Sequence, residues 1–155
     1  MIAAAPRPSE ISFVCHRLRE QSAEEMFMLS WHDSPEALAQ RFINLAGFQW
    51  VAYDGTEPAA IFGAHPLWPG TWSLYGFGTD RYGNVLREVT KHFRREVVPA
   101  VRGSGAHRAQ CMSPAHHTET HRWLEMLGGS EEATLRCYGR RGEDMKIFAW
   151  FKETA

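Results

Sequence analysis

The spacing of hydrophobic and polar residues predicts short strands alternating with amphipathic helices along the chain. The middle of the sequence holds three runs rich in aromatic and β-branched residues, separated by an Asp-Gly turn and a Pro-Gly turn. Such turns between apolar runs are typical of hairpins. We therefore expect a three-stranded antiparallel meander over residues 48–54, 59–68 and 71–79. Gly76 and Gly78 in the third run predict a bulge or a close approach by another backbone or a ligand.

The segment before the meander is expected to hold one strand and two helices. Residues 1–9, with two prolines, are predicted to be an irregular lead-in, and Ile11 to Leu18 is strand-like. Ser22 with Glu25 has the spacing of a capping box, which predicts a helix start. A second helix is expected to begin at Ser34-Pro35 and to end at Gly47.

After the meander, apolar positions recur every three or four residues from Asn84 to Val101, which predicts a long amphipathic helix. A strand from His107 to Met112, a helix ending at Leu127 and a closing hairpin are expected to follow. The predicted order is β-α-α-β-β-β-α-β-α-β-β. This order indicates a single α/β domain over residues 1–155, with a mixed sheet and helices on both faces.

Composition restricts the possible partners. The 155 residues are 44% hydrophobic and 23% charged, with a net charge of −1 and no long block of like charge. Nucleic-acid binding is therefore not expected, although the basic face of the long helix leaves it open. No apolar run approaches the length of a membrane span and no signal peptide is apparent, so we expect a protein that is not secreted. Three widely spaced cysteines indicate free thiols.

The predicted element order, from about Ile11 to Lys152, resembles that of the GCN5-related N-acetyltransferase (GNAT) fold. The resemblance implies that acetyl-CoA lies between the fourth and fifth strands, with its pyrophosphate at the start of the following helix. It implies the following cofactor-binding residues: Phe77, Gly78, Thr79, Arg81, Gly83 and Asn84. At the three positions of the family's phosphate-loop motif stand Gly78, Arg81 and Gly83, and only Gly83 fits the motif.

The catalytic positions of the family also depart from the usual pattern. Leu124 stands where the family commonly has a tyrosine that protonates the departing thiolate, and Trp123 beside it offers only an indole N–H. The fourth strand lacks the glutamate often used to take the amine proton. Tyr75 and His65 are the substitute catalytic candidates, because a histidine titrates near neutral pH.

A closer resemblance is to the small acetyltransferase-like proteins of short-tailed bacteriophages, one branch of which is an internal virion protein. It rests on the run from Trp72 to Arg95, on the helix ending in Leu-Gly and on the two strands that follow. It implies either acetyl transfer to an amine or a non-catalytic role with phage virion proteins. The expected location is the host cytoplasm or the virion interior.

Histidines near the predicted last helix offer a possible metal pair. His117 and His121 have the i, i+4 spacing that can hold zinc, but further ligands would have to come from elsewhere, Cys111 being one candidate. A solvated, histidine-rich helix start explains the same residues. We expect no metal site.

Overall fold

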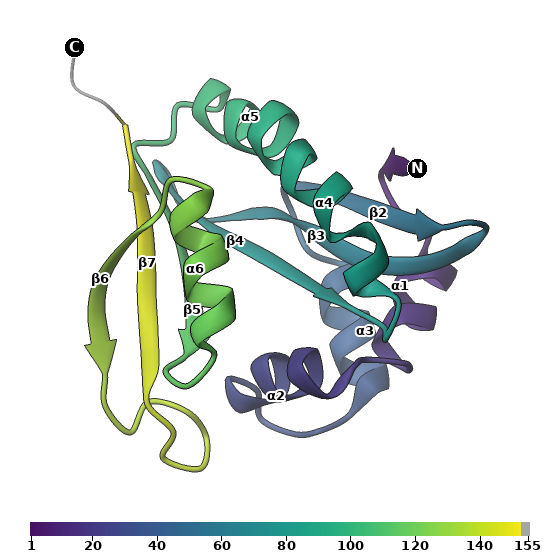
Figure 1. Cartoon of the computed structure of the whole chain (residues 1–155), viewed down its shortest axis with the longest axis horizontal. Helices are drawn as coiled ribbons and strands as arrows, with labels where there is room; N and C mark the ends of the chain where they lie inside the picture. The colour runs from purple at the N-terminus through teal and green to yellow at the C-terminus, as the bar shows by residue number, and fades with distance from the viewer. Residues whose placement is uncertain (153–155) are drawn as a thin grey trace.

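The computed structural model describes residues 1–152 and contains one seven-stranded mixed sheet with helices on both faces (Figure 1). The strands in chain order are β1 Ile2–Ala4, β2 Phe48–Asp54, β3 Glu57–Trp68, β4 Thr71–Gly78, β5 Arg108–Pro114, β6 Ser130–Leu135 and β7 Met145–Phe151. The helices are α1 Pro8–Cys15, α2 Glu20–Met28, α3 Pro35–Ile43, α4 Tyr82–His92, α5 Val98–Gly103 and α6 Thr118–Met126. The order across the sheet is β1-β2-β3-β4-β5-β7-β6. The fold class predicted from the sequence is confirmed.

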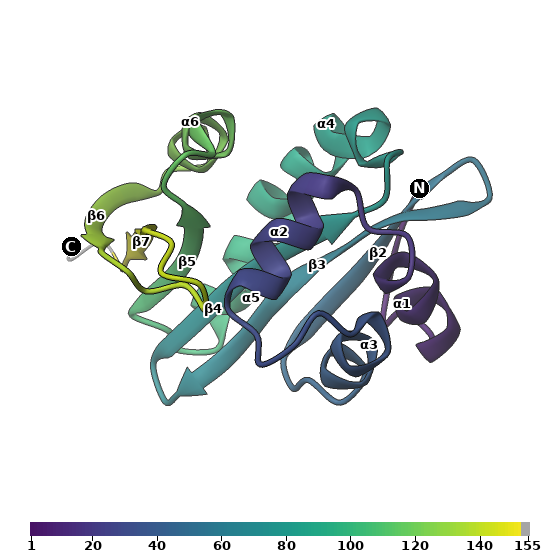
Figure 2. The same ribbon diagram turned by 90° about the horizontal axis from the view of Figure 1, so that it is seen from below.

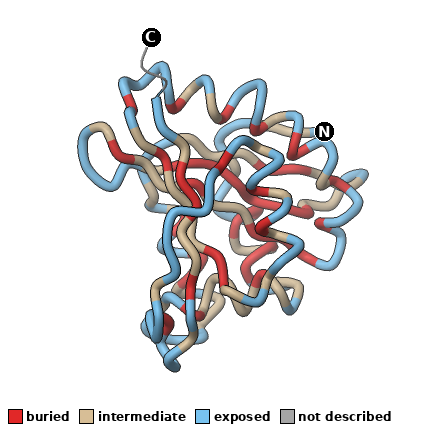
Figure 3. Tube along the Cα trace, turned by 60° about the vertical axis from the view of Figure 1, so that its left-hand side comes forward, coloured by how far each residue is buried: buried red, intermediate tan, exposed pale blue. Residues whose placement is uncertain are grey.

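The strands β2, β3 and β4 form the predicted meander, with antiparallel pairing throughout. Side chains on these strands alternate between two cores, as the pleat of a sheet requires. Val51, Ile61 and Phe77 pack with α1 and α3 on one face. The residues next to them, such as Ala52 and Phe62, pack with α4 and α5 on the other face. Figure 2 shows these helices on opposite sides of the sheet, and Figure 3 shows buried positions concentrated along the central strands.

The N-terminal segment differs from the prediction. The lead-in expected to be irregular contains β1, which pairs with β2. The strand expected at Ile11–Leu18 is helix α1 instead. Pro8 begins this helix, and the backbone N–H of Arg7 donates to Oε1 of Glu10 at 2.8 Å. Ile11, Val14 and Cys15 are buried, and their spacing of three and four residues places them on one helix face.

Helix α2 also begins earlier than the capping box predicts. It starts at Glu20, so Ser22 lies inside the helix rather than at its N-cap. The hydroxyl oxygen of Ser22 accepts a hydrogen bond from the backbone N–H of Gly78 at 3.2 Å. At helix α3 the prediction holds, because Oγ of Ser34 accepts the N–H of Ala37 at 3.2 Å.

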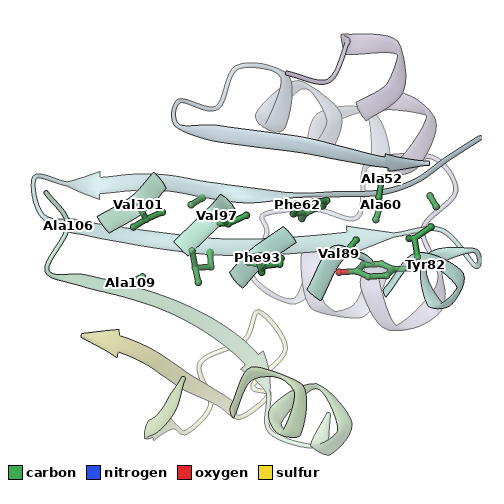
Figure 4. Close-up of a cluster of buried hydrophobic side chains, with 14 residues drawn as sticks. Ala52, Ala60, Phe62, Tyr82, Val89, Phe93, Val97, Val101, Ala106 and Ala109 are labelled. Carbon is green, nitrogen blue, oxygen red and sulfur yellow. The ribbon is translucent and has the colours of Figure 1, made fainter. Parts of the chain in front are cut away.

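The predicted long helix is present but contains a wide turn. Residues Phe93–Val97 form a π-helical turn between α4 and α5. Pro99 is the second residue of α5 and cannot donate to the carbonyl four residues before it, so a looser turn there accommodates its ring. The apolar face stays continuous across this turn, with Val89, Phe93, Val97 and Val101 all buried against the sheet (Figure 4).

Candidate functional site

Strands β4 and β5 separate soon after they meet, and this splay forms the candidate site. They are the parallel neighbours in the sheet, and they pair only at Thr71–Ser73 with Arg108–Gln110. Beyond these three positions the strands diverge, as Figure 1 shows. The sheet is therefore divided into an N-terminal half, β1 to β4, and a C-terminal half, β5 to β7.

On the α2 and α3 side of the splay lies a cleft of about 510 Å³. A cleft of this size matches ligand sites for small molecules, which are about 300–1,000 Å³. Its walls are largely apolar and include Met26, Met28, Leu29, Phe42 and Leu67. The ionisable side chains among its lining residues are Glu25, Arg41, His65, Tyr75, Cys111, Tyr138 and Arg140.

The opposite side of the splay, between α4 and α6, is nearly filled by side chains. The remaining slot is about 50 Å³, lined in part by Tyr82, Phe93, Trp123, Leu124 and Trp150. Aromatic contacts hold it closed, because the rings of Phe93 and Trp123 meet edge-on with centroids 5.8 Å apart. A pantetheine arm does not fit this slot unless some of these side chains move.

Tyr82 explains the two glycines in β4. Its ring lies between α4 and the sheet (Figure 4). A Cβ at Gly78 would come within 2.2 Å of this ring, and one at Gly76 within 3.0 Å of the Tyr82 hydroxyl. The close approach predicted from the sequence therefore occurs. It comes from the Tyr82 side chain at both glycines and, at Gly78, also from another backbone, because the Ala59 carbonyl oxygen would lie 2.5 Å from the added Cβ. No bulge is present at either glycine.

The backbone of Gly78 is already engaged by the N-terminal segment. Its N–H donates to Ser22, and its carbonyl accepts the N–H of Arg19 at 3.0 Å. Because backbone groups alternate in direction along a strand, those of Gly76 also face the splay. β5 no longer pairs at that level, so Gly76 is the position in β4 whose polar backbone is directed at the gap.

In the predicted phosphate loop, Thr79 to Asn84, the side chains of Arg81 and Asn84 point toward the β2–β3 turn. Nε of Arg81 lies 2.7 Å from a carboxylate oxygen of Glu57, and the Asn84 side chain donates to Asp54 at 3.0 Å. The hydroxyl of Thr79 accepts the N–H of Arg81 at 3.1 Å. These contacts turn the Arg81 guanidinium toward carboxylates, so an anion at the start of α4 would rely on backbone N–H groups.

The two remaining predicted cofactor residues differ in environment. Phe77 is fully buried and packs edge-on against Phe42, so its side chain belongs to the core. Gly83 lies in the first turn of α4, and a Cβ there would meet nothing within 4 Å. Packing does not require a glycine at this position, and the backbone is open to approach from outside.

The two catalytic candidates, His65 and Tyr75, both line the cleft. Their ring centroids are 5.9 Å apart. Partial burial, together with the nearby Arg41 cation, lowers the pKa of His65, so the imidazole is neutral at neutral pH. Burial raises the pKa of Tyr75 to about 12, and its hydroxyl accepts a hydrogen bond from Gln49 at 3.0 Å.

The position of the usual proton donor carries no acid. Leu124 is buried beside the closed slot. The indole N–H of Trp123 donates to the Thr90 hydroxyl at 2.8 Å, so it is already used within the protein. Thr90 lies on α4, which means that this hydrogen bond ties α6 to α4 across the slot.

Sequence reasoning missed Glu25 as a site residue. It lies on α2 and lines both the cleft and the closed slot. Its capping-box spacing suggested a local role at a helix start, but its carboxylate oxygen accepts a hydrogen bond from Nδ1 of His117 at 2.8 Å. A contact between residues 92 positions apart leaves no signal in a single sequence.

Several solved structures share this arrangement of strands and helices. An acetyltransferase of the GNAT family from Bacillus anthracis superposes with a TM-score of 0.72 over 97% of this chain and 94% of its own, at 11% identity. The chain has the GNAT acyltransferase fold. A ribosomal-protein-alanine N-acetyltransferase from Brucella melitensis matches with a TM-score of 0.71 over 98% of this chain and 99% of its own, at 15% identity.

A GNAT-fold protein from Salmonella typhimurium, solved with its cofactor acetyl-CoA, matches with a TM-score of 0.70 at 16% identity, over 100% of this chain and 95% of its own. No protein-family model and no curated protein matches the sequence. The described part of the chain, residues 1–152, contains no helix long and apolar enough to cross a membrane. At these identities the solved structures establish the fold, while the site residues assigned from the sequence stay predictions.

Proposed function

We propose that the chain is an acyl-CoA-dependent N-acyltransferase that acetylates an amine. One observation carries the proposal: β4 and β5 part after three paired positions, which directs the backbone of Gly76 into the gap beside a cleft of about 510 Å³. The GNAT fold and its neighbour solved with acetyl-CoA support the choice of cofactor. Acetyl-CoA would supply an activated thioester.

The cleft is suited to an acceptor substrate that carries an amine on a mainly apolar skeleton. Its methionine and leucine side chains would pack against the body of the acceptor, and the carboxylate of Glu25 would attract a cationic amine. An amine must lose its proton to react. His65, neutral because its pKa is lowered, is the candidate base. Tyr75 beside it stays protonated, because burial raises its pKa to about 12, so it is a candidate proton donor.

On the cofactor side, this proposal requires the closed slot to open. At the start of α4 the N–H groups of Tyr82 and Asn84 already donate to the carbonyls of Thr79 and Arg81. The N–H of Gly83 is therefore the one that would bind phosphate, and Arg81 could join it only by leaving Glu57. Trp123 is the side chain whose displacement would widen the slot most directly, because it bridges α6 to Thr90 and Phe93.

Calorimetric titration with acetyl-CoA tests the proposal. We expect binding in the micromolar to millimolar range for the natural chain, and tighter binding for Trp123→Leu, since the smaller side chain opens the slot. Trp68→Leu is the matched control, because Trp68 is 61% exposed on β3 and lies outside the slot. Absence of heat at millimolar acetyl-CoA with both the natural chain and Trp123→Leu would exclude the proposal.

Turnover is then measured as release of the free CoA thiol in the presence of primary amines of different size and polarity. We expect His65→Gln to lower turnover by about 10²-fold or more, in the range of general-base contributions, while acetyl-CoA affinity is unchanged. Equal turnover of His65→Gln and the natural chain at every pH would remove His65 from the mechanism.

A second candidate function is a non-catalytic one, in which the fold serves for assembly or interaction. The filled slot and the aliphatic Leu124 favour it. The bacteriophage relationship inferred from the sequence, with virion proteins as partners and the virion interior or host cytoplasm as location, remains a prediction within this candidate. Mass spectrometry of purified phage particles and of infected-cell assemblies tests it, and absence from both would contradict it.

A further inference from the structure

Two acidic and two histidine side chains meet across the outer edge of the splay. Glu24 and Glu25 lie on α2, while His116 and His117 lie just before α6. Nε2 of His116 is 2.7 Å from one carboxylate oxygen of Glu24, and Nε2 of His117 is 3.3 Å from the other. The cluster connects the N-terminal half of the sheet to the C-terminal half.

We propose that Glu24, His116 and His117 form a site for a divalent transition metal of the zinc class. One ligand atom from each residue can be chosen so that all three lie within 4.8 Å of one another. Around tetrahedral zinc, with bonds of about 2.0–2.1 Å, ligand atoms are about 3.3 Å apart. His116 is 62% exposed, so its ring can rotate to bring its ligand atom closer to those of Glu24 and His117 without disturbing the core.

The hydrogen bond behind His117 supports this assignment independently. Its Nδ1 lies 2.8 Å from Oε1 of Glu25 and its side chain is 8% exposed, so the ring is fixed in place. When Nδ1–H donates to this carboxylate, the lone pair of Nε2 is directed toward Glu24. Metal-binding histidines characteristically donate their second ring N–H to a carboxylate in this way.

The ligand types restrict the choice of metal. Two imidazole nitrogens and one carboxylate oxygen suit zinc, copper or nickel, whereas magnesium and calcium prefer oxygen ligands alone. Three protein ligands leave a fourth position for water. The metal would fasten α2 to the start of α6 and, through His117, would fix Glu25, which lines the cleft.

This site differs from the histidine pair suggested by the sequence. His121 is buried, and its Nε2 donates to the carbonyl of Pro114 at 3.0 Å, so it is engaged in the loop before α6. Cys111 lies in the splay, where burial raises the pKa of its thiol to about 12, which disfavours the thiolate that binds metal. The partners of His117 come from α2 instead.

Titration of the full, tag-free chain with Co²⁺ and Zn²⁺ after chelator treatment tests the site. We expect one equivalent of Co²⁺ to bind with visible absorption bands typical of a four-coordinate site, and Zn²⁺ to displace it. His116→Ala and Glu24→Gln should abolish micromolar binding, and Glu25→Gln should weaken it by about 10–100-fold. His16→Ala is the matched control, since His16 is an exposed histidine at the end of α1.

Melting curves of the metal-free variants establish that each one is folded, and His116→Ala is the safest variant because its side chain is largely exposed. A protonated imidazole held between the two carboxylates would account for the same contacts without a metal. In that case no visible bands and no saturable Zn²⁺ heat appear at neutral pH, and the proposal is wrong. Unchanged Zn²⁺ affinity in both His116→Ala and Glu24→Gln would overturn it equally.

Discussion

The position of Tyr82 over β4 can be tested with a pair of small substitutions. A Cβ at Gly76 would lie 3.0 Å from the Tyr82 hydroxyl, and the next nearest atom, Cβ of Phe62, would be 3.5 Å away. Gly76→Ala therefore forces a shift of the tyrosine in the natural chain. In Tyr82→Phe the hydroxyl is absent, and the added methyl group makes only ordinary contacts.

Two opposing terms set the expected magnitudes. Overpacking a core costs about 1–3 kcal/mol, while replacing glycine by alanine in a strand contributes about 0.5–1 kcal/mol of stability. We expect Gly76→Ala to lower the free energy of unfolding by about 0.5–2 kcal/mol in the natural chain, and to raise it slightly in Tyr82→Phe. The coupling between the two changes should be about 1–3 kcal/mol.

Urea denaturation of the four chains measures this coupling. Each kcal/mol corresponds to about 2–4 °C in melting temperature for a protein of this size, so thermal unfolding is an independent check. Phe62→Leu in the natural background is a useful comparison, because it alters the same core without touching the hydroxyl. If Gly76→Ala costs the same free energy with tyrosine and with phenylalanine at position 82, the hydroxyl does not lie where the structure has it.

Three further predictions follow from burial and charge. At pH 8 iodoacetamide should modify only the exposed Cys137 in the native protein, because burial raises the pKa of both Cys15 and Cys111 to about 12. Intact-mass spectra that show three adducts before urea is added would contradict this. Burial lowers the pKa of His121 below 6.5, so the unfolded chain takes up the proton first and the free energy of unfolding should fall as the pH drops below 6.5. In urea titrations between pH 7 and 5, His121→Gln should lose less of this free energy than the natural chain, and an identical loss in both would refute the assignment. Arg81→Gln should change the free energy of unfolding by less than about 1 kcal/mol, since the ion pair of Arg81 with Glu57 is exposed, and should leave acetyl-CoA affinity unchanged. A tenfold weaker affinity would show that Arg81 leaves Glu57 to bind phosphate.

Local signals account for the elements that could be predicted from the sequence. The β2–β3–β4 meander follows from turn residues and apolar runs that are contiguous in the chain. Helix α3 follows from its Ser34 cap and a proline in its first turn. Helix α1 was not predictable in the same way, because a short apolar segment fits either a strand or a helix, and the contact with α3 that selects the helix is not local.

The site was predictable only in outline. The element order indicates where β4 and β5 should part, but the width of the slot depends on the direction of the Tyr82 and Trp123 side chains, which tertiary packing decides. Likewise, His117 signals a possible metal ligand, yet its partners Glu24 and Glu25 are more than 90 residues earlier in the chain. The spacing of His117 and His121 suggested that the second metal ligand would lie on the same helix, whereas the partner in the proposed site is Glu24 on α2.

The two sides of the splay are mechanically linked through the short β4–β5 pairing. Three paired positions hold the halves together in the sheet, and side chains complete the junction on each side. On one side Trp123 joins α6 to Thr90 on α4, and on the other His117 joins the start of α6 to Glu25 on α2. Entry of a pantetheine arm would have to separate the first contact, whereas a metal would strengthen the second. Because α6 takes part in both, metal affinity and acetyl-CoA affinity should depend on each other, and linkage requires that each ligand change the affinity for the other by the same factor.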